Sequence, residues 1–162
     1  MARVLVVDDT LFMRTLIKSI LKSAGHTVVA EAKDGEEAYR KYMMHRPDLV
    51  TMDITMHGMN GLDAVKCITD YDKEAKIIMI SAMSQKSMVI QAVKNGAKHF
   101  IIKPITVEKV VQVINEVMGS KDGVLVDKEG FKEIKRSIED VKKAIKDIDK
   151  SIEIIDKENK SL

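Results

Sequence analysis

The sequence has no tryptophan and few other aromatic residues, with three tyrosines and three phenylalanines among 162 residues. Because 45% of the residues are still hydrophobic, aliphatic side chains must supply most of the core. Cys67 is the single cysteine, which excludes a disulfide within one chain and fits a reducing compartment. No apolar run is long enough for a signal peptide or a membrane span. We therefore expect a cytoplasmic protein that does not enter a membrane.

The sequence also lacks an excess of charge of either sign. Lys and Arg total 27 against 25 Asp and Glu, which gives a net charge of +2. A nucleic-acid-binding domain needs basic residues gathered on one face, and nothing in this balance points to one. We expect no nucleic-acid partner.

The sequence does contain a regular alternation of patterns over residues 1–118. Short, nearly continuous apolar runs are typical of parallel strands buried on both faces, and helical patterns lie between them. The expected strands lie at residues 4–7, 28–30, 49–52, 77–80 and 100–102, and the expected helices at 11–24, 35–46, 61–71, 84–95 and 107–118. Asp34 with Glu37, and Thr106, have the positions of helix caps. The alternation predicts an α/β fold, a doubly wound five-stranded parallel sheet with helices on both faces.

The pattern changes after Gly119. From residue 131 onward, apolar side chains recur three and four residues apart, as in a coiled coil. This seam consists of Phe131, Ile134, Ile138, Val141, Ile145, Ile148, Ile152 and Ile155. We therefore divide the chain into a domain at residues 1–119, a linker at 120–127 and an amphipathic, coiled-coil-like helix at 128–162.

The seam favours self-association of the chain through residues 131–155. It spans roughly 37 Å at about 1.5 Å per residue, which is long for packing against one small domain. In an antiparallel pair, Lys135 would face Asp156 and Lys142 would face Asp149, whereas a parallel pair gains no such match. We expect a homo-oligomer with antiparallel pairing, as a dimer or as a four-helix bundle of such pairs. Packing of the helix back onto the first domain is the alternative.

Charged and polar residues follow the expected strands directly. Asp8 and Asp9 follow the first strand, Asp53 the third, Ser81 the fourth and Lys103 the fifth. In open α/β sheets, ligands bind outside the carboxyl ends of the strands, where the strand order reverses. If the order is 2-1-3-4-5, the first and third strands are neighbours at that point, and the three carboxylates converge there.

This set of side chains is suited to phosphoryl transfer. Carboxylates without His or Cys suit a hard cation that keeps several waters, which favours Mg²⁺. Transfer of a phosphoryl group needs mainly positioning and charge neutralisation, and Lys103 and Ser81 could contact phosphate oxygens. A carboxylate nucleophile needs no general base, because it is already ionised at neutral pH. The residues therefore predict an acyl phosphate on Asp53.

Four motifs stand in order at these strand ends: VLVVDD, MDITM, ISA and FIIKP. Together they resemble the receiver domain of response regulators throughout residues 1–118, and DDTLFMR and SAMSQ resemble most its stand-alone chemotaxis members. Receivers have a flavodoxin-like sheet of order 2-1-3-4-5 and are a standard example of the strand-end rule. The resemblance implies Asp8 and Asp9 as the acidic metal-binding pair, Asp53 as phosphoacceptor and metal ligand, the Thr55 backbone carbonyl as a further ligand, Ser81 as the switch hydroxyl, Phe100 as the switch aromatic and Lys103 as the ammonium that contacts phosphate.

The resemblance also implies a signalling role. A histidine kinase would donate the phosphoryl group to Asp53, and the face made by the fourth helix, fifth strand and fifth helix would change its affinity for a downstream target protein. That target could be a flagellar motor switch or a phosphatase. We expect no independent enzymatic output beyond the chain's own phosphorylation and dephosphorylation.

Three alternatives stay open. The chain could be a phosphorelay intermediate, or a coiled-coil scaffold with a vestigial receiver. It could also be a phosphohydrolase with an aspartate nucleophile, although the haloacid-dehalogenase type carries a D-x-D motif and Asp8 and Asp9 are adjacent.

The sequence departs from the receiver pattern at three positions. His57 stands where receivers usually carry proline, four residues after the phosphoacceptor, so a fixed φ is lost near the Thr55 carbonyl. Phe100 replaces the frequent tyrosine and has no hydroxyl. Met83, two residues after Ser81, is apolar at a position that tunes the lifetime of the phosphoryl group in this family, and that lifetime is therefore not predicted.

Overall fold

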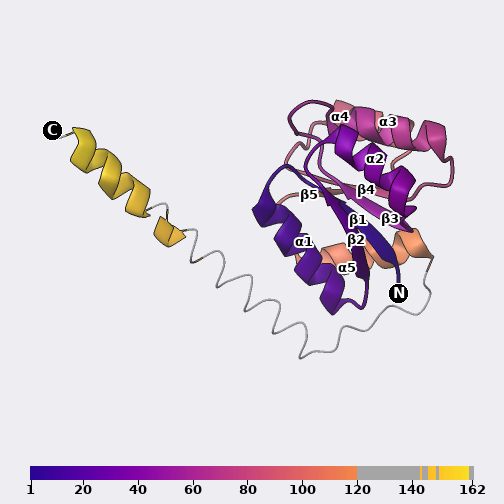
Figure 1. Cartoon of the computed structure of the whole chain (residues 1–162), viewed down its shortest axis with the longest axis horizontal. Coiled ribbons are helices and arrows are strands. Elements are labelled where there is room, and N and C mark those ends of the chain that lie inside the picture. Colours follow the sequence, from indigo (N-terminus) through magenta and orange to yellow (C-terminus); the bar gives the residue numbers. More distant parts are fainter. Residues whose placement is uncertain (120–142, 144–145, 149, 161–162) are drawn as a thin grey trace. The chain divides into compact units, whose positions relative to one another are not determined.

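The computed structural model describes residues 1–119, 143, 146–148 and 150–160. Within residues 1–119, strands and helices alternate along the chain (Figure 1). The strands are β1 (Arg3–Val7), β2 (Thr27–Ala32), β3 (Leu49–Met52), β4 (Ile77–Ser81) and β5 (His99–Ile102). The helices are α1 (Leu11–Ser23), α2 (Gly35–His45), α3 (Gly61–Tyr71), α4 (Lys86–Lys94) and α5 (Val107–Met118).

The five strands form one parallel sheet in the order β2-β1-β3-β4-β5, which confirms the predicted fold. Helices α1 and α5 pack together on one face, and α2, α3 and α4 cover the other (Figure 1). This order makes β1 and β3 neighbours in the middle of the sheet. None of the described helices has both the length and the apolar composition that crossing a membrane requires.

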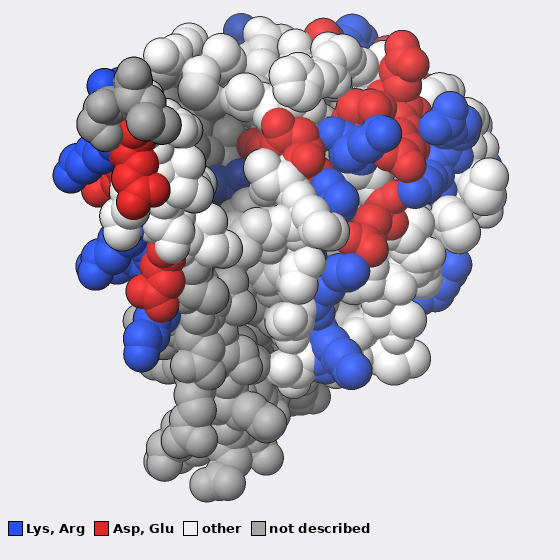
Figure 2. Space-filling view, turned by 60° about the vertical axis from the view of Figure 1, so that its left-hand side comes forward, with Lys and Arg blue, Asp and Glu red and all other residues white. Residues whose placement is uncertain are grey.

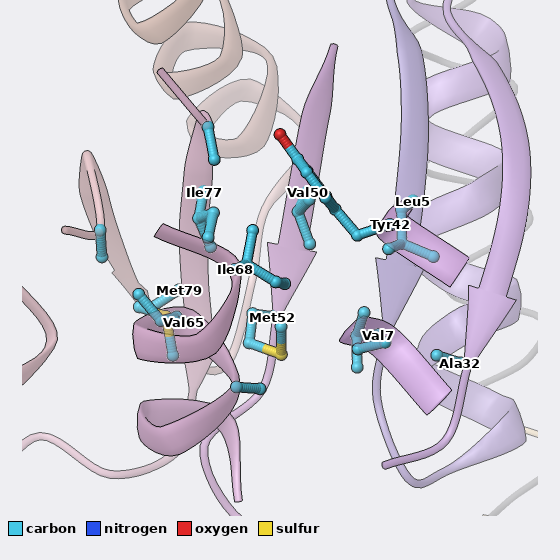
Figure 3. Close-up of a cluster of buried hydrophobic side chains, with 14 of the residues drawn as sticks. Leu5, Val7, Ala32, Tyr42, Val50, Met52, Val65, Ile68, Ile77 and Met79 are labelled. Carbon is cyan, nitrogen blue, oxygen red and sulfur yellow. The ribbon is translucent and has the colours of Figure 1, made fainter. Parts of the chain in front are cut away.

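The core on the α2–α4 side anchors the ends of the central strands. Figure 3 shows Val7, Met52 and Met79, from β1, β3 and β4, on the same side of the sheet as Val65 and Ile68 of α3. All five are fully buried or nearly so. Burial of one large aliphatic side chain contributes about 1.5–3 kcal/mol. Val7 and Met52 directly precede Asp8 and Asp53. This packing therefore fixes the position of the backbone at both aspartates.

The predicted caps start the helices as expected. The Asp34 side chain accepts a hydrogen bond from the Glu37 N–H at 2.8 Å, and the Thr106 hydroxyl accepts one from the Lys109 N–H at 3.2 Å. The capping box at α2 differs in its second half. The Glu37 carboxylate accepts from the Lys33 N–H at 3.0 Å, one residue before the cap.

The predicted helix bounds were wrong by one or two residues at four ends. Ala24, Arg46 and Asn95 are C-caps rather than helical residues, and Arg46 has a left-handed φ of 43°. Helix α4 begins at Lys86 rather than at residue 84, and its N-cap, Gln85, makes no side-chain cap bond.

The C-terminal segment forms a second unit. The chain divides into Met1–Val126 and Asp127–Leu162. In the second unit, residues 146–148 and 150–160 are helical, in agreement with the predicted helix. Three seam residues lie in this part, and Ile148, Ile152 and Ile155 are 58%, 51% and 55% exposed. The predicted linker at 120–127 lies outside the described residues, and so do the other seam residues, Phe131, Ile134, Ile138, Val141 and Ile145.

Candidate functional site

The carboxyl ends of β1 and β3 bring three carboxylates together. Val7 pairs with Met52 across these strands, so Asp8 and Asp53 leave the sheet side by side. The Asp53 N–H donates to the Val7 carbonyl at 3.0 Å, which continues the ladder into the site. Oxygen atoms of Asp8, Asp9 and Asp53 all lie within 4.8 Å of one another. The side chains of Asp8 and Asp53 are only 1% and 6% exposed, and Asp9 is more open to solvent.

Lys103 supplies the positive charge nearest to these carboxylates. Its Nζ lies 2.9 Å from Asp8 Oδ2 and 3.5 Å from Asp53 Oδ2. Strand β4 separates β5 from β3, so the lysine reaches across the end of β4. The Lys103 N–H donates to the Ser81 carbonyl at 2.9 Å, which ties the start of its loop to that strand. Because both carboxylates are buried, removing this ammonium would leave uncompensated charge in the interior.

The pKa of the Asp53 carboxyl is raised above its usual value. Burial is the main cause, because it disfavours the charged form. The ammonium of Lys103 acts in the opposite direction, and the negative charge of Asp8 adds to the rise. The charge on Asp53 therefore depends on the cations around it, and a further cation near the three carboxylates would favour the ionised form.

Asp8 is held by residues whose role sequence reasoning missed. Its Oδ1 accepts hydrogen bonds from the Thr10 N–H and the Thr10 hydroxyl, both at 2.9 Å. The same hydroxyl accepts from the Met13 N–H at 3.3 Å and caps α1. Arg14 Nη1 donates to the backbone carbonyl of Asp8 at 2.8 Å. A threonine directly after two aspartates and before a helix was a readable signal, whereas nothing in the sequence shows where the Arg14 side chain points.

The other three residues predicted for the site, Ser81, Phe100 and Thr55, lie on three different elements. Ser81 is fully buried at the end of β4, and its hydroxyl oxygen accepts from the Met83 N–H at 3.2 Å. Phe100 on β5 is partly buried and packs against the core on the α2–α4 side, as does Met83. Thr55 is exposed in the loop after Asp53. Two residues beyond it in the same loop, His57 is also exposed.

Gly61 lies against the backbone of Asp53. The loop after β3 returns so closely that the Gly61 N–H donates to the Ile54 carbonyl at 2.9 Å. A Cβ atom on Gly61 would lie 1.8 Å from the Asp53 carbonyl oxygen. Only glycine fits here, so the start of α3 holds the peptide that carries Asp53. Sequence reasoning placed Gly61 at the helix start but did not find this contact.

The donor set fits the hard cation predicted from the sequence. Three carboxylates with no His or Cys among them offer only oxygen ligands, which Mg²⁺ prefers. The pairing of Lys103 with two of the three shows that this position already favours positive charge. Asp8, Asp9 and Asp53 are therefore the residues that would hold the ion.

Comparison with known proteins gives the same family for most of the chain. The response regulator receiver domain matches residues 4–115. The chemotaxis protein CheY of Thermotoga maritima is 54% identical over 115 residues, which cover 71% of this chain and 96% of that protein. CheY of Bacillus subtilis is 53% identical over 116 residues, which cover 72% and 97%. The C-terminal helix lies beyond the end of the family match.

Solved structures agree with these relatives. A chain of the CheX–CheY complex with BeF3 and Mg²⁺ from Borrelia burgdorferi matches with a TM-score of 0.70 and 41% identity, over 71% of this chain and 87% of that one. The response regulator domain of Thermotoga maritima CheB matches with a TM-score of 0.68 and 37% identity, over 74% and 97%.

Gly61→Ala should destabilise the protein by about 3 kcal/mol, because the added methyl group overlaps the Asp53 carbonyl and forces the backbone to move. The free energy of unfolding from urea titrations measures this. Gly58→Ala is the matched control from the same loop, since a Cβ there meets nothing within 4 Å. Its cost should be only about 1 kcal/mol, from the positive φ of 70°. Equal losses for the two variants would contradict the tight contact at Gly61.

Proposed function

The chain belongs to the response regulator receiver family, and from this premise we propose that Asp53 accepts a phosphoryl group from a histidine kinase in a Mg²⁺-dependent reaction. The observation that carries the proposal is the pairing of one ammonium with two buried carboxylates at the strand ends. A buried carboxylate beside a fixed ammonium suits a phosphoryl group, which brings additional negative charge.

In the proposed reaction, a carboxylate oxygen of Asp53 attacks phosphorus while the bond from phosphorus to the kinase's histidine nitrogen breaks. Asp53 Oδ1 accepts from the Ile54 N–H at 2.7 Å, whereas Oδ2 faces Lys103, so Oδ2 is the oxygen placed to attack. A bound Mg²⁺ would neutralise charge on the phosphoryl oxygens and on the three aspartates. Lys103 then exchanges a carboxylate for a phosphoryl oxygen as its partner. In-line transfer requires little else from the protein.

Ser81 and Phe100 are the proposed switch residues. The Ser81 hydroxyl oxygen accepts from the Met83 N–H, and the Ser81 side chain also hydrogen-bonds to the Asp53 carboxylate, so its O–H can turn from that carboxylate to a new phosphoryl oxygen. Such a turn draws the loop between β4 and α4 towards Asp53. Phe100 and Met83 are both partly buried and pack against the same core cluster, so we propose that movement of this loop opens space into which the ring can turn. The face made by α4, β5 and α5 changes as a result, and Ile90, Val93 and Ile102 are the exposed apolar side chains in these elements.

The proposed output is a change in affinity for a protein in a chemotaxis pathway. The relatives named CheY support chemotaxis, and the Borrelia burgdorferi structure pairs a CheY with CheX. On the face drawn in Figure 2, Lys and Arg side chains alternate with Asp and Glu and do not gather into one basic patch. This alternation suits a protein target, such as a phosphatase or a motor protein, better than nucleic acid.

Incubation with acetyl phosphate and Mg²⁺ should add the mass of one phosphoryl group to the intact chain. The adduct should be stable in acid and labile in base, as an acyl phosphate is, and absent in Asp53→Asn or without Mg²⁺. Asp63→Asn is the matched control, because it makes the same chemical change on α3 outside the carboxylate cluster. Intact-mass spectrometry at short times measures the outcome. An equal adduct on Asp53→Asn, or none on the unaltered chain, would contradict the proposal, and the second result would favour a coiled-coil scaffold with a vestigial receiver.

We also propose that the chain self-associates through residues 131–155, in antiparallel pairs. Ile148, Ile152 and Ile155 lie at seam spacing and are more than half exposed in the single chain. Apolar side chains that recur in this way are normally buried against a partner helix. Two receiver domains would then be joined in one particle, so that a target could bind two phosphorylated faces.

Light scattering should give the mass of two or of four chains, each of 18.2 kDa. Ile152→Asp should shift the mass towards the monomer, because it places a charge in the seam. Ile154→Asp is the matched control, since Ile154 is 58% exposed but lies roughly 200° around the helix from Ile152. A monomer mass for the unaltered chain, or dissociation of both variants alike, would contradict the seam.

A further inference from the structure

Strand β2 contacts the N–H of Asp8 directly and its carbonyl indirectly, through Arg14 of α1. Its N–H donates to the Ala32 carbonyl at 3.1 Å. Its carbonyl oxygen accepts from Arg14 Nη1 at 2.8 Å. Arg14 is in turn held by Glu31, with Nε 3.4 Å from Glu31 Oε1. Two adjacent residues of β2, Glu31 and Ala32, therefore fix the peptide groups on either side of Asp8.

The hydrogen bond from Arg14 orients the peptide that joins Asp8 to Asp9. A peptide group is planar, so fixing its oxygen also fixes the nitrogen and the Cα direction of the next residue. Asp9 is the most open of the three carboxylates, and no described hydrogen bond or ion pair holds its side chain in place. Its position thus depends on the backbone, and Arg14 is the side chain that donates to the carbonyl of the peptide before it.

We propose that Arg14 is a positioning residue for the metal site, held in place by Glu31, and that it raises the affinity of the Asp8–Asp9 pair for a divalent cation. This inference rests on the proposed function, because it concerns the same site. Arg14 does not reach the carboxylates of the cluster through any described hydrogen bond. It acts through the Asp8 carbonyl, and its side chain is 17% exposed, which places the contact largely out of solvent.

The sign of the effect separates positioning from simple electrostatics. Arg14 carries a positive charge close to a cation site, so its charge alone weakens cation binding, and removing it should strengthen binding. If the hydrogen bond to the Asp8 carbonyl is what matters, removing Arg14 should instead weaken binding. Outer residues that orient metal ligands typically change metal affinity by about 10- to 100-fold.

Lys18 provides a matched control on the same helix. Its Nζ lies 2.8 Å from Glu31 Oε2, so it shares the carboxylate that holds Arg14. No described hydrogen bond or ion pair joins Lys18 to Asp8. Lys18→Met and Arg14→Met therefore remove the same charge and the same kind of contact to Glu31, and only Arg14→Met removes the donor to Asp8.

The test is a calorimetric titration of the full chain and of the two variants with Mg²⁺, with urea unfolding to confirm that each variant is folded. The dissociation constant for Arg14→Met should be at least about 10-fold above that for Lys18→Met. The Asp9 amide, followed by NMR without metal, should shift in Arg14→Met and stay unchanged in Lys18→Met. If Arg14→Met does not fold, Arg14→Lys serves in its place, because it keeps the charge and removes the guanidinium whose Nη1 and Nε contact the Asp8 carbonyl and Glu31.

Equal or tighter Mg²⁺ binding by Arg14→Met, compared with Lys18→Met, would overturn the positioning role and leave the metal site intact. The absence of Mg²⁺ binding in the unaltered chain would instead contradict the proposed function, and the inference with it. The two failures are therefore distinct.

Discussion

The mutual repulsion of two buried carboxylates is the constraint on which the site depends. Asp8 and Asp53 leave neighbouring strands side by side, nearly without access to water, and like charges in such a place are stable only beside a cation. Lys103 provides that cation from two strands away. The strand order makes this possible, because it places β1 and β3 together and leaves β5 within reach of a long side chain across β4.

Contacts from other segments also hold the backbone of these two aspartates in place. Gly61 lies against the carbonyl of Asp53, and Arg14 binds the carbonyl of Asp8. Thr10 joins the Asp8 carboxylate to the first turn of α1. A site held in this way does not need to rearrange its acidic residues when a cation or phosphoryl group binds. In the proposed switch, Lys103 and the loop after Ser81 are the parts that move. Their movement would carry the signal from the site to the protein-binding face.

The sequence was sufficient to predict the sheet, the strand ends and the residues that follow them, because each depends on local patterns. Apolar runs located the strands, and Asp34 and Thr106 located two helix starts. The contacts that complete the site could not be predicted in the same way. The contact of Gly61 with Asp53 and that of Arg14 with Asp8 depend on how separate segments pack. The spacing of apolar residues along the sequence does not predict such contacts. Helix α4 also lacks a side-chain cap at Gln85, so no capping residue in the sequence marks where it starts.

The central claim is that Lys103 balances the carboxylates until a phosphoryl group and a divalent cation take over. A crystal structure with Mg²⁺ and BeF3 tests it most directly. The account predicts an ion among Asp8, Asp9 and Asp53, the beryllium group on Asp53, and Lys103 Nζ displaced from its present 2.9 Å contact with Asp8 towards a fluorine atom. A structure in which Lys103 still pairs with Asp8 and nothing is attached to Asp53 would contradict it.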